Sequence, residues 1–274
     1  MKKCSYCGRE NTDDANFCRE CGNSEFVTPH PAPAQAIFEA GTPEIAATTT
    51  PDEPLAEETR PLCERWRPRT AWICLLTTVL VLIFAAFLLL ATTDQAKWRG
   101  FRSPEDMGVG IILSCIIPFA VTLYFSGVRT MRAFKESFAF IPISREQVAT
   151  AAATGFLIQA VTIYLFDGGL AHLNLRGSLN AYVVALLLAP FLEEPAWRGF
   201  LYKAFRNRYP VWTSTILVVA IVLLFHGRPA FHLRGATAIG LLNVAACILR
   251  ERTGSLWPPI VCHLAFNAIP AATS

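Results

Sequence analysis

Long apolar runs separated by short polar loops constrain the fold of this 274-residue chain more than any other feature. A helix needs about 20 apolar residues to cross the ~30 Å hydrocarbon core of a bilayer. Runs of this kind occupy about 71–91, 108–128, 148–166, a segment that begins near 179, 211–225, 236–249 and 256–269. The last two are short, and we expect them to be tilted or partly re-entrant. With 53% hydrophobic and 16% charged residues, the chain is too apolar for a soluble globule. The sequence therefore predicts an all-α polytopic membrane protein with about seven transmembrane helices.

The polar loops carry Lys and Arg in a pattern that predicts orientation. A basic collar (Arg60, Arg65, Arg67 and Arg69) precedes the first run, and further clusters lie at 129–145, 203–208 and 250–252. These four clusters fall on one side of the membrane if there are seven spans, and Lys and Arg concentrate in cytoplasmic loops. We therefore expect a multi-pass protein of the cell membrane with a cytoplasmic N-terminus. Trp66 and Trp72 flank the start of the first run and are expected to be interfacial anchors.

Two cysteine pairs begin the chain, Cys4-x2-Cys7 and Cys18-x2-Cys21. Four thiolates at this spacing close a tetrahedral shell around one Zn²⁺ ion, which is a structural cofactor and not a catalytic one. The stretch resembles the small zinc-ribbon modules at the N-termini of many prokaryotic membrane proteins. Disulfide pairing is the alternative, because so short a segment lacks a core. Acidic residues offset the basic ones here, so we expect a protein partner and no nucleic acid.

Composition divides the rest of the chain. After a zinc ribbon at 1–23, residues 24–69 form a segment rich in Pro, Ala, Thr and Glu that ends in the basic collar. Such a segment buries too little apolar surface to offset its chain entropy, so we expect a flexible linker. Residues 70–144 hold the first two expected spans, and residues 145–274 form the expected membrane core.

Two adjacent carboxylates, Glu193 and Glu194, end the fourth apolar run. A charge deep in hydrocarbon costs roughly 2.5–3.5 kcal/mol on insertion scales, so it indicates a functional site. Arg198 lies four residues after Glu194 and can pair with it on one helical face. Glu193 points about 100° away and is left without this partner. Pro190 and Pro195 bracket the pair, and each can kink the helix and open space beside Glu193.

Three more polar residues interrupt the later runs. His226 ends the fifth, and His263 and Asn267 share one helical face of the last. A lone buried histidine usually satisfies a backbone carbonyl. Four separate polar intrusions in one half of the chain instead indicate a single site. At ~1.5 Å per residue, the carboxylates and both imidazoles fall at depths inside the membrane.

These motifs resemble a known family. The pattern Glu193-Glu194-x3-Arg198-Gly199, a histidine at the end of the next span, and His263-x3-Asn267 are similar to the CAAX-protease and bacteriocin-processing family (CPBP or Abi). Its members are intramembrane endopeptidases, and the similarity covers about residues 145–270. The family's second motif is usually FxxxH, whereas Val222 stands four residues before His226 here. His232 is the alternative histidine for that motif.

The resemblance implies catalytic roles. Glu193 would be the general base that activates a water, assisted by His226. Glu194 would pair with Arg198 and hold its helical turn. The implied activity is hydrolysis of peptide bonds in membrane-associated, prenylated or peptide substrates, so lipid and a peptide or membrane-protein substrate are the expected partners.

The resemblance also implies an oxyanion site. His263 and Asn267 would donate hydrogen bonds to the tetrahedral intermediate, and each donor is worth roughly 3–4 kcal/mol. The Glu and His residues offer an alternative, a catalytic Zn²⁺ as in metalloproteases. We favour the metal-free scheme because the chain lacks an HExxH motif.

A different class of function also fits the motifs. A non-proteolytic membrane scaffold or immunity protein could keep the polar cluster for packing and recruit a cytoplasmic partner through the zinc ribbon. A transporter fits less well, because no internal repeat is visible.

Overall fold

The computed structural model describes residues 1–4, 10–13, 26–27, 61–92, 115–167, 183–226 and 231–272. The chain divides into two compact units, Met1–Arg60 and Pro61–Ser274, and each is described by itself. Of the expected linker at 24–69, residues 24–25 and 28–60 lie outside the described residues, whereas 61–69 belong to the second unit.

The first unit contains a small antiparallel sheet. Its central strand β1 (Lys2–Cys4) pairs with β2 (Glu10–Asn11) on one side and with β3 (Phe26–Val27) on the other. The side chain of Cys4 is buried. The other three expected zinc ligands, Cys7, Cys18 and Cys21, lie outside the described residues.

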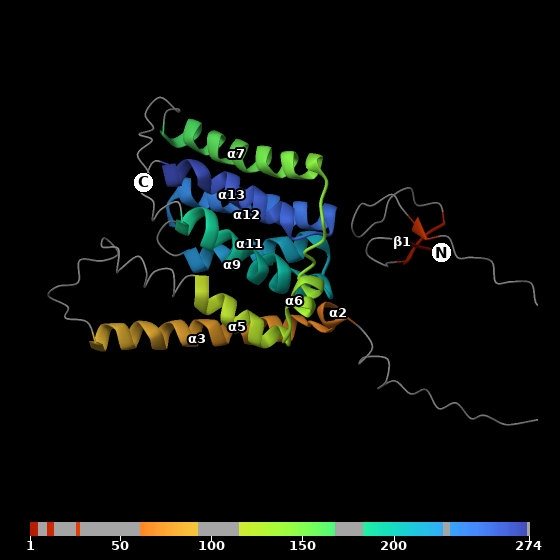
Figure 1. Cartoon of the computed structure of the whole chain (residues 1–274), viewed down its shortest axis with the longest axis horizontal. Coiled ribbons are helices and arrows are strands. Elements are labelled where there is room, and N and C mark those ends of the chain that lie inside the picture. The colour runs from red at the N-terminus through yellow and green to blue at the C-terminus, as the bar shows by residue number, and fades with distance from the viewer. Residues whose placement is uncertain are drawn as a thin grey trace, which may run out of the picture. The chain divides into compact units, whose positions relative to one another are not determined.

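The second unit is helical. In chain order its helices are α2 (Leu62–Arg65), α3 (Pro68–Thr92), α5 (Ile117–Ser126), α6 (Met131–Ser137), α7 (Arg145–Asp167), the π-helix η3 (Val183–Leu188), α9 (Ala189–Glu194), the π-helix η4 (Pro195–Leu201), α10 (Tyr202–Arg206), α11 (Val211–His226), α12 (Leu233–Thr253) and α13 (Trp257–Ala272). The long helices run roughly parallel, with α7 and α3 at opposite edges and α13, α12 and α11 between them (Figure 1). Helix α13 packs against α7, α12 and α9, which makes it the centre of the unit.

Three of the described helices are long and apolar enough to cross a membrane: Pro68–Leu88, Arg145–Phe166 and Leu233–Thr253. Shorter apolar helices cover Ile117–Ser126 and Val211–His226. Each expected apolar run therefore contains helical residues. The sixth run was expected at 236–249, and its helix is longer because it continues past Arg250 to the cap at Gly254.

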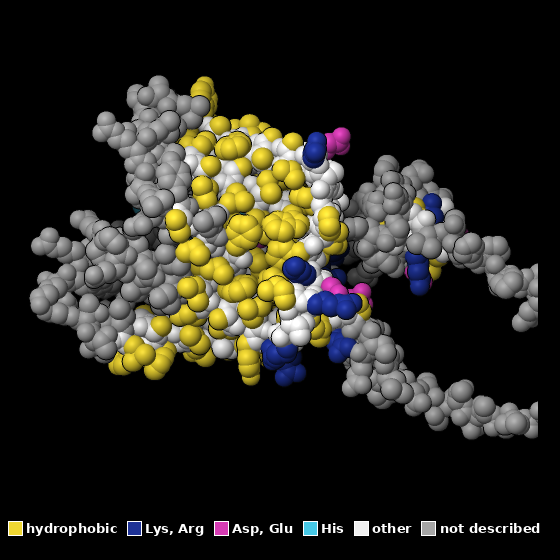
Figure 2. Space-filling view, in the orientation of Figure 1, with side chains coloured by type: hydrophobic (Ala, Val, Ile, Leu, Met, Phe, Trp, Pro, Cys, Tyr) yellow, Lys and Arg dark blue, Asp and Glu magenta, His cyan; other side chains and the backbone are white. Residues whose placement is uncertain are grey.

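Apolar side chains dominate the outside of the helical unit. Hydrophobic residues cover much of the visible face, and Lys and Arg gather toward one end (Figure 2). On α3, Ile83, Phe84 and Phe87 all face outward. Apolar surface of this extent needs a lipid or protein neighbour, and a bilayer meets that need.

At one end of the unit, the loops between the helices are joined to one another by hydrogen bonds. The chain before α3, the loops on either side of α6, the turn after α10 and the turn before α13 all meet there. Their hydrogen bonds run from Asn207 Nδ2 to the carbonyls of Cys63 and Trp66 (2.8 Å each), from Trp66 Nε1 to the carbonyl of Ser126 (3.0 Å), and from Leu256 N to the carbonyl of Ala139 (2.9 Å). These connections carry the basic clusters that the sequence assigns to one side of the membrane.

Trp66 is not an interfacial anchor, and that prediction was wrong. Only 4% of its surface is exposed, and its ring packs edge-on against Phe138 (5.4 Å between centroids) and Phe200 (5.0 Å). The chain leaves helical geometry at Trp66, between α2 and α3, and so turns the indole under the bundle. Trp72, one turn into α3, is 46% exposed, as an anchor would be.

Two glycines allow close packing around the candidate motifs. A Cβ at Gly155 in α7 would overlap the carbonyl oxygen of Cys262, so α7 crosses α13 almost backbone to backbone. A Cβ at Gly199 in η4 would overlap the ring of Phe138. Both crossings need a residue without a side chain.

Candidate active site

The glutamate motif lies in an irregular helical segment. Two π-helical turns, Val183–Leu188 and Pro195–Leu201, flank the short α-helix that ends at Glu194. Proline lacks the N–H that an α-helix needs, and π-helical turns are frequent at functional sites. Near the two prolines the helix is thus irregular, with wider π-helical turns on both sides of the carboxylates.

Glu194 is the centre of a buried polar network. Its side chain is 0% exposed, and its Oε1 atom accepts hydrogen bonds from Arg198 Nη1 (3.2 Å) and His263 Nδ1 (2.8 Å). The predicted Glu194–Arg198 ion pair is therefore present, and it has an imidazole as a second partner. Within the described part of the chain, Oε2 has no hydrogen-bond partner. A buried carboxylate is tolerated only when donors such as Arg198 and His263 compensate its charge.

Arg198 connects this network to α12. Its side chain is 1% exposed, and Nη2 donates to Asn243 Oδ1 (2.5 Å). Asn243 in turn donates from Nδ2 to the carbonyl of Ile239 (2.7 Å). Asn243 was not predicted as a site residue, although an amide inside an apolar run is the same kind of signal as Asn267.

Glu193 has different surroundings from its neighbour. It is half-buried, and the thiol of Cys115, just before α5, donates to its Oε1 atom (3.4 Å). Among the described residues, no arginine or lysine forms an ion pair with Glu193. Its carboxylate is therefore less constrained than that of Glu194. A cysteine in an apolar run gives no distinctive signal, so this contact was not predicted.

His226 is half-buried at the end of α11. Its Nδ1 atom lies 2.8 Å from the carbonyl oxygen of Val222. A carbonyl can only accept, so Nδ1 carries the proton, and Nε2 is an acceptor in the neutral ring. Phe225 packs against Trp197 (5.3 Å between centroids). His232, the alternative histidine, is exposed at the cap of α12 and is not among the residues that line the cavity described next.

A cavity of about 230 Å³ joins these groups. All six predicted site residues line it: Glu193, Glu194, Arg198, His226, His263 and Asn267. Asn243 is a further polar neighbour, and apolar side chains from α11, α12 and α13 complete the wall. Acidic, imidazole and amide groups from separate helices thus share one space inside an apolar bundle, where water could be bound and activated.

The described side chains do not form a catalytic metal shell. No three His, Cys, Asp or Glu residues in the described ranges are grouped closely enough to hold an ion. Glu194 is already bonded to Arg198 and His263, which leaves it poorly arranged as a ligand.

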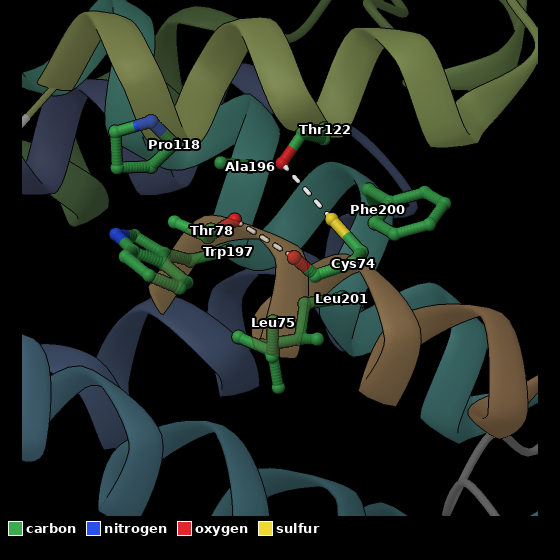
Figure 3. A pocket seen from close by; sticks show the side chains of 9 residues that line it. All are labelled: Cys74, Leu75, Thr78, Pro118, Thr122, Ala196, Trp197, Phe200 and Leu201. Atoms are coloured by element: carbon green, nitrogen blue, oxygen red, sulfur yellow. Dashed lines mark hydrogen bonds between the residues drawn. The ribbon is translucent and has the colours of Figure 1, made fainter. Parts of the chain in front are cut away.

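The other face of the motif helix packs against α3 and α5. Ala196, Trp197, Phe200 and Leu201 line a small cavity there, of about 10 Å³, together with Cys74, Leu75, Thr78, Pro118 and Thr122 (Figure 3). Within this wall Thr78 Oγ1 donates to the carbonyl of Cys74 (2.8 Å), and the Cys74 thiol lies 3.9 Å from Thr122 Oγ1. The first helices of the unit therefore support the segment that carries the carboxylates.

Comparison with known families identifies two domains. Residues 175–269 match the family model described as type II CAAX prenyl endopeptidase Rce1-like, and residues 3–24 match a zinc-ribbon domain. All six predicted site residues fall inside the first match, and all four cysteines of the predicted zinc site fall inside the second. No curated protein and no solved structure matches the chain significantly.

Residues 175–269 thus resemble the type II CAAX prenyl endopeptidase Rce1-like family, and residues 3–24 resemble a zinc-ribbon domain. The family resemblance inferred from the motifs is confirmed. Helices α3, α5 and α7 precede the matched segment, yet α7 packs on α13 and the other two pack around the motif helix.

Proposed function

From the presence of a CAAX-endopeptidase-like domain, we propose that this chain is an intramembrane endopeptidase that hydrolyses peptide bonds with a water activated by Glu193. One observation carries the proposal. Carboxylate, imidazole and amide groups from α9, α11 and α13 line a single cavity within an apolar helical unit.

Glu193 is the proposed general base. Its carboxylate lines the cavity, and among the described residues it accepts one hydrogen bond, from the Cys115 thiol, so a carboxylate with this partner has capacity to accept from a water molecule. His226 offers Nε2 as a second acceptor, since its Nδ1 proton is held by the Val222 carbonyl. As the water oxygen bonds to the scissile carbonyl carbon, Glu193 takes its proton. The same proton then passes to the leaving amine as the C–N bond breaks.

His263 and Asn267 are the proposed oxyanion donors. Because the Nδ1 proton of His263 points at Glu194, donation into the cavity must come from Nε2, and this requires the doubly protonated ring. Glu194 and Arg198 cancel each other in charge. A doubly protonated His263 beside that neutral pair gives the site one net positive charge, which would stabilise the developing oxyanion. Preorganised donors contribute most in a buried site of this kind.

We further propose seven spans with the basic end of the unit in the cytoplasm. In this arrangement Cys4, Cys7, Cys18 and Cys21 of the zinc ribbon would hold a structural Zn²⁺ in a reducing compartment, and the ribbon would bind a protein partner. The apolar part of the cavity wall, including Val222, suits membrane-associated or prenylated substrates and other apolar peptides.

Purified full-length protein in lipid nanodiscs, incubated with a library of quenched fluorescent peptides, tests this function. We expect cleavage by the unaltered protein, loss of about 100-fold or more in Glu193→Gln, and no loss on adding a chelator that leaves the helical unit folded. Glu146→Gln, at an exposed position in the first turn of α7, is the matched control and should keep full activity.

A folded protein that cleaves no peptide, or a Glu193→Gln variant that cleaves at the normal rate, would refute the proposal. A phenotype in cells that survives Glu193→Gln but requires the ribbon cysteines would favour the scaffold function instead. Loss of cleavage on chelation, with the fold retained, would favour a catalytic metal.

A further inference from the structure

Asn243 is a buried amide in the middle of a membrane-length helix. It is 2% exposed, and α12 is otherwise apolar around it. An amide in such surroundings costs free energy unless its hydrogen bonds are made. Both the nitrogen and the oxygen of this amide form hydrogen bonds. Nδ2 donates to the Ile239 carbonyl one turn earlier, and Oδ1 accepts from Arg198 Nη2.

The orientation of the amide is determined by its two partners. A guanidinium can only donate and a backbone carbonyl can only accept. The oxygen of Asn243 must therefore point at Arg198, and the nitrogen must point at Ile239. The side chain is a fixed acceptor aimed at one terminal nitrogen of the guanidinium.

Two acceptors thus hold the two terminal nitrogens of Arg198. Asn243 Oδ1 binds Nη2 and Glu194 Oε1 binds Nη1 (3.2 Å), which fixes the plane of the guanidinium as well as its position. Glu194 Oε1 is also the atom that accepts from His263 Nδ1 (2.8 Å). Because Arg198 and His263 bind the same carboxylate oxygen, a shift of Arg198 would also shift the imidazole.

We propose that Asn243 is a positioning residue for peptide hydrolysis, acting through Arg198 and Glu194 to hold the His263 ring with Nε2 toward the cavity. The inference rests on the proposed function. Without the Asn243 oxygen, Nη2 of Arg198 loses an acceptor, and the guanidinium that donates to Oε1 beside His263 is held less firmly. A displacement of about 1 Å caused away from the reacting atoms can lower a rate by about 100-fold.

Helix docking does not depend on Asn243. About two turns further along, Glu251 of α12 accepts from Arg206 Nη2 (2.9 Å) and Nε (3.2 Å), and from the Tyr202 hydroxyl (3.0 Å). This forked ion pair holds α10 against α12. Loss of the Asn243 oxygen is therefore expected to disturb the site more than the fold.

Substitutions that separate shape from hydrogen bonding test the inference. Asn243→Leu keeps the approximate volume and removes the acceptor, whereas Asn243→Asp keeps an acceptor oxygen in the same place. In the peptide assay we expect Asn243→Leu to lower kcat by about 10- to 100-fold with KM within about twofold, and Asn243→Asp to recover most of the loss. Leu241→Ala, on the exposed face of α12, is the control and should change neither constant.

A second measurement is independent of cleavage. In ¹⁵N-histidine NMR spectra, the Nδ1 proton of His263 reports its bond to Glu194. We expect this signal to move in Asn243→Leu and to keep its position in Leu241→Ala. If Asn243→Leu fails to fold, Asn243→Ser, which withdraws the acceptor by shortening the side chain, takes its place.

The two measurements separate the two ideas. A wild-type protein that does not cleave any peptide refutes the proposed function, while the histidine signal still tests the positioning role. An unchanged His263 signal in Asn243→Leu overturns the inference whether or not the protein is a protease. Equal kcat in Asn243→Leu and wild type overturns it as well.

Discussion

The buried ion pair between Glu194 and Arg198 makes a quantitative prediction about stability. Both side chains are almost completely buried, at 0% and 1% exposed. Arg198→Met removes the cation and leaves the carboxylate with His263 as its remaining donor among the described residues. Glu194→Gln removes the anion and leaves a buried guanidinium that keeps only neutral acceptors such as Asn243.

The expected loss of stability follows from the difference between removing one partner of a buried ion pair and removing both. Removing one partner of such a pair costs about 3–5 kcal/mol, because the other charge stays buried and uncompensated. For a domain of this size about 1 kcal/mol shifts the Tm by about 2–4 °C, so each single variant should melt roughly 6–20 °C lower. Replacing both partners removes both charges, and this is often close to neutral. The double variant should therefore be at least as stable as either single one. The amide oxygen introduced by Glu194→Gln can still accept from His263.

Thermal unfolding of the four proteins in one detergent, followed by tryptophan fluorescence, gives the double-mutant cycle. We expect a coupling energy of about 2 kcal/mol or more between the two positions. Losses that simply add in the double variant would show that the two charges do not compensate each other, and would refute the ion pair as a stabilising contact. Glu251, in the separate ion pair with Arg206, provides a comparison, since Glu251→Gln should not couple to Arg198→Met.

Three further predictions concern other contacts. Cys115→Ala should lower kcat by about 2- to 10-fold, because Glu193 loses one hydrogen bond worth about 1 kcal/mol, whereas Cys115→Ser should keep normal turnover in the peptide assay. Gly155→Ala should lower the stability by about 1–3 kcal/mol through its clash with the α13 backbone. Gly240→Ala, where nothing lies within 4 Å, should raise it by up to about 1 kcal/mol, and thermal unfolding measures both. Cys4→Ser should lower the zinc content, which mass spectrometry should give as about one ion per chain in the wild type, while peptide cleavage by the helical unit continues. A zinc-free wild-type protein would contradict the ribbon assignment.

The helices could be placed from the sequence because an apolar run of membrane length has few other ways to satisfy its backbone. Their ends were harder to predict. The sixth run was expected to stop at 249, where basic residues begin, but α12 continues to Thr253 and ends at Gly254, whose left-handed backbone lets its N–H donate to the carbonyl of Arg250 (3.0 Å). Trp66 was misjudged for a related reason. Its burial depends on a break between two helices and on contacts with residues far away in the chain.

The candidate site was predictable to the extent that polar residues in apolar runs are rare. This rule found six of the residues that line the cavity, and applied to α12 it would also have found Asn243. It could not predict which groups bind one another. The bond between Glu194 and His263 joins residues 69 positions apart, and it depends on how α9 packs against α13. The contact between Cys115 and Glu193 likewise depends on where the start of α5 lies.

The crossing at Gly155 has a consequence for how this architecture can vary among proteins. Helix α7 lies outside the segment that matches the endopeptidase family, so its sequence might be thought free to change. Yet its backbone rests on the carbonyl of Cys262, the residue directly before His263, and any side chain added at 155 would push against the turn that carries the imidazole. Other chains that share this arrangement should keep a bare backbone at the same point. In such chains a larger residue at this point would require the two helices to lie further apart, and the imidazole would move with them.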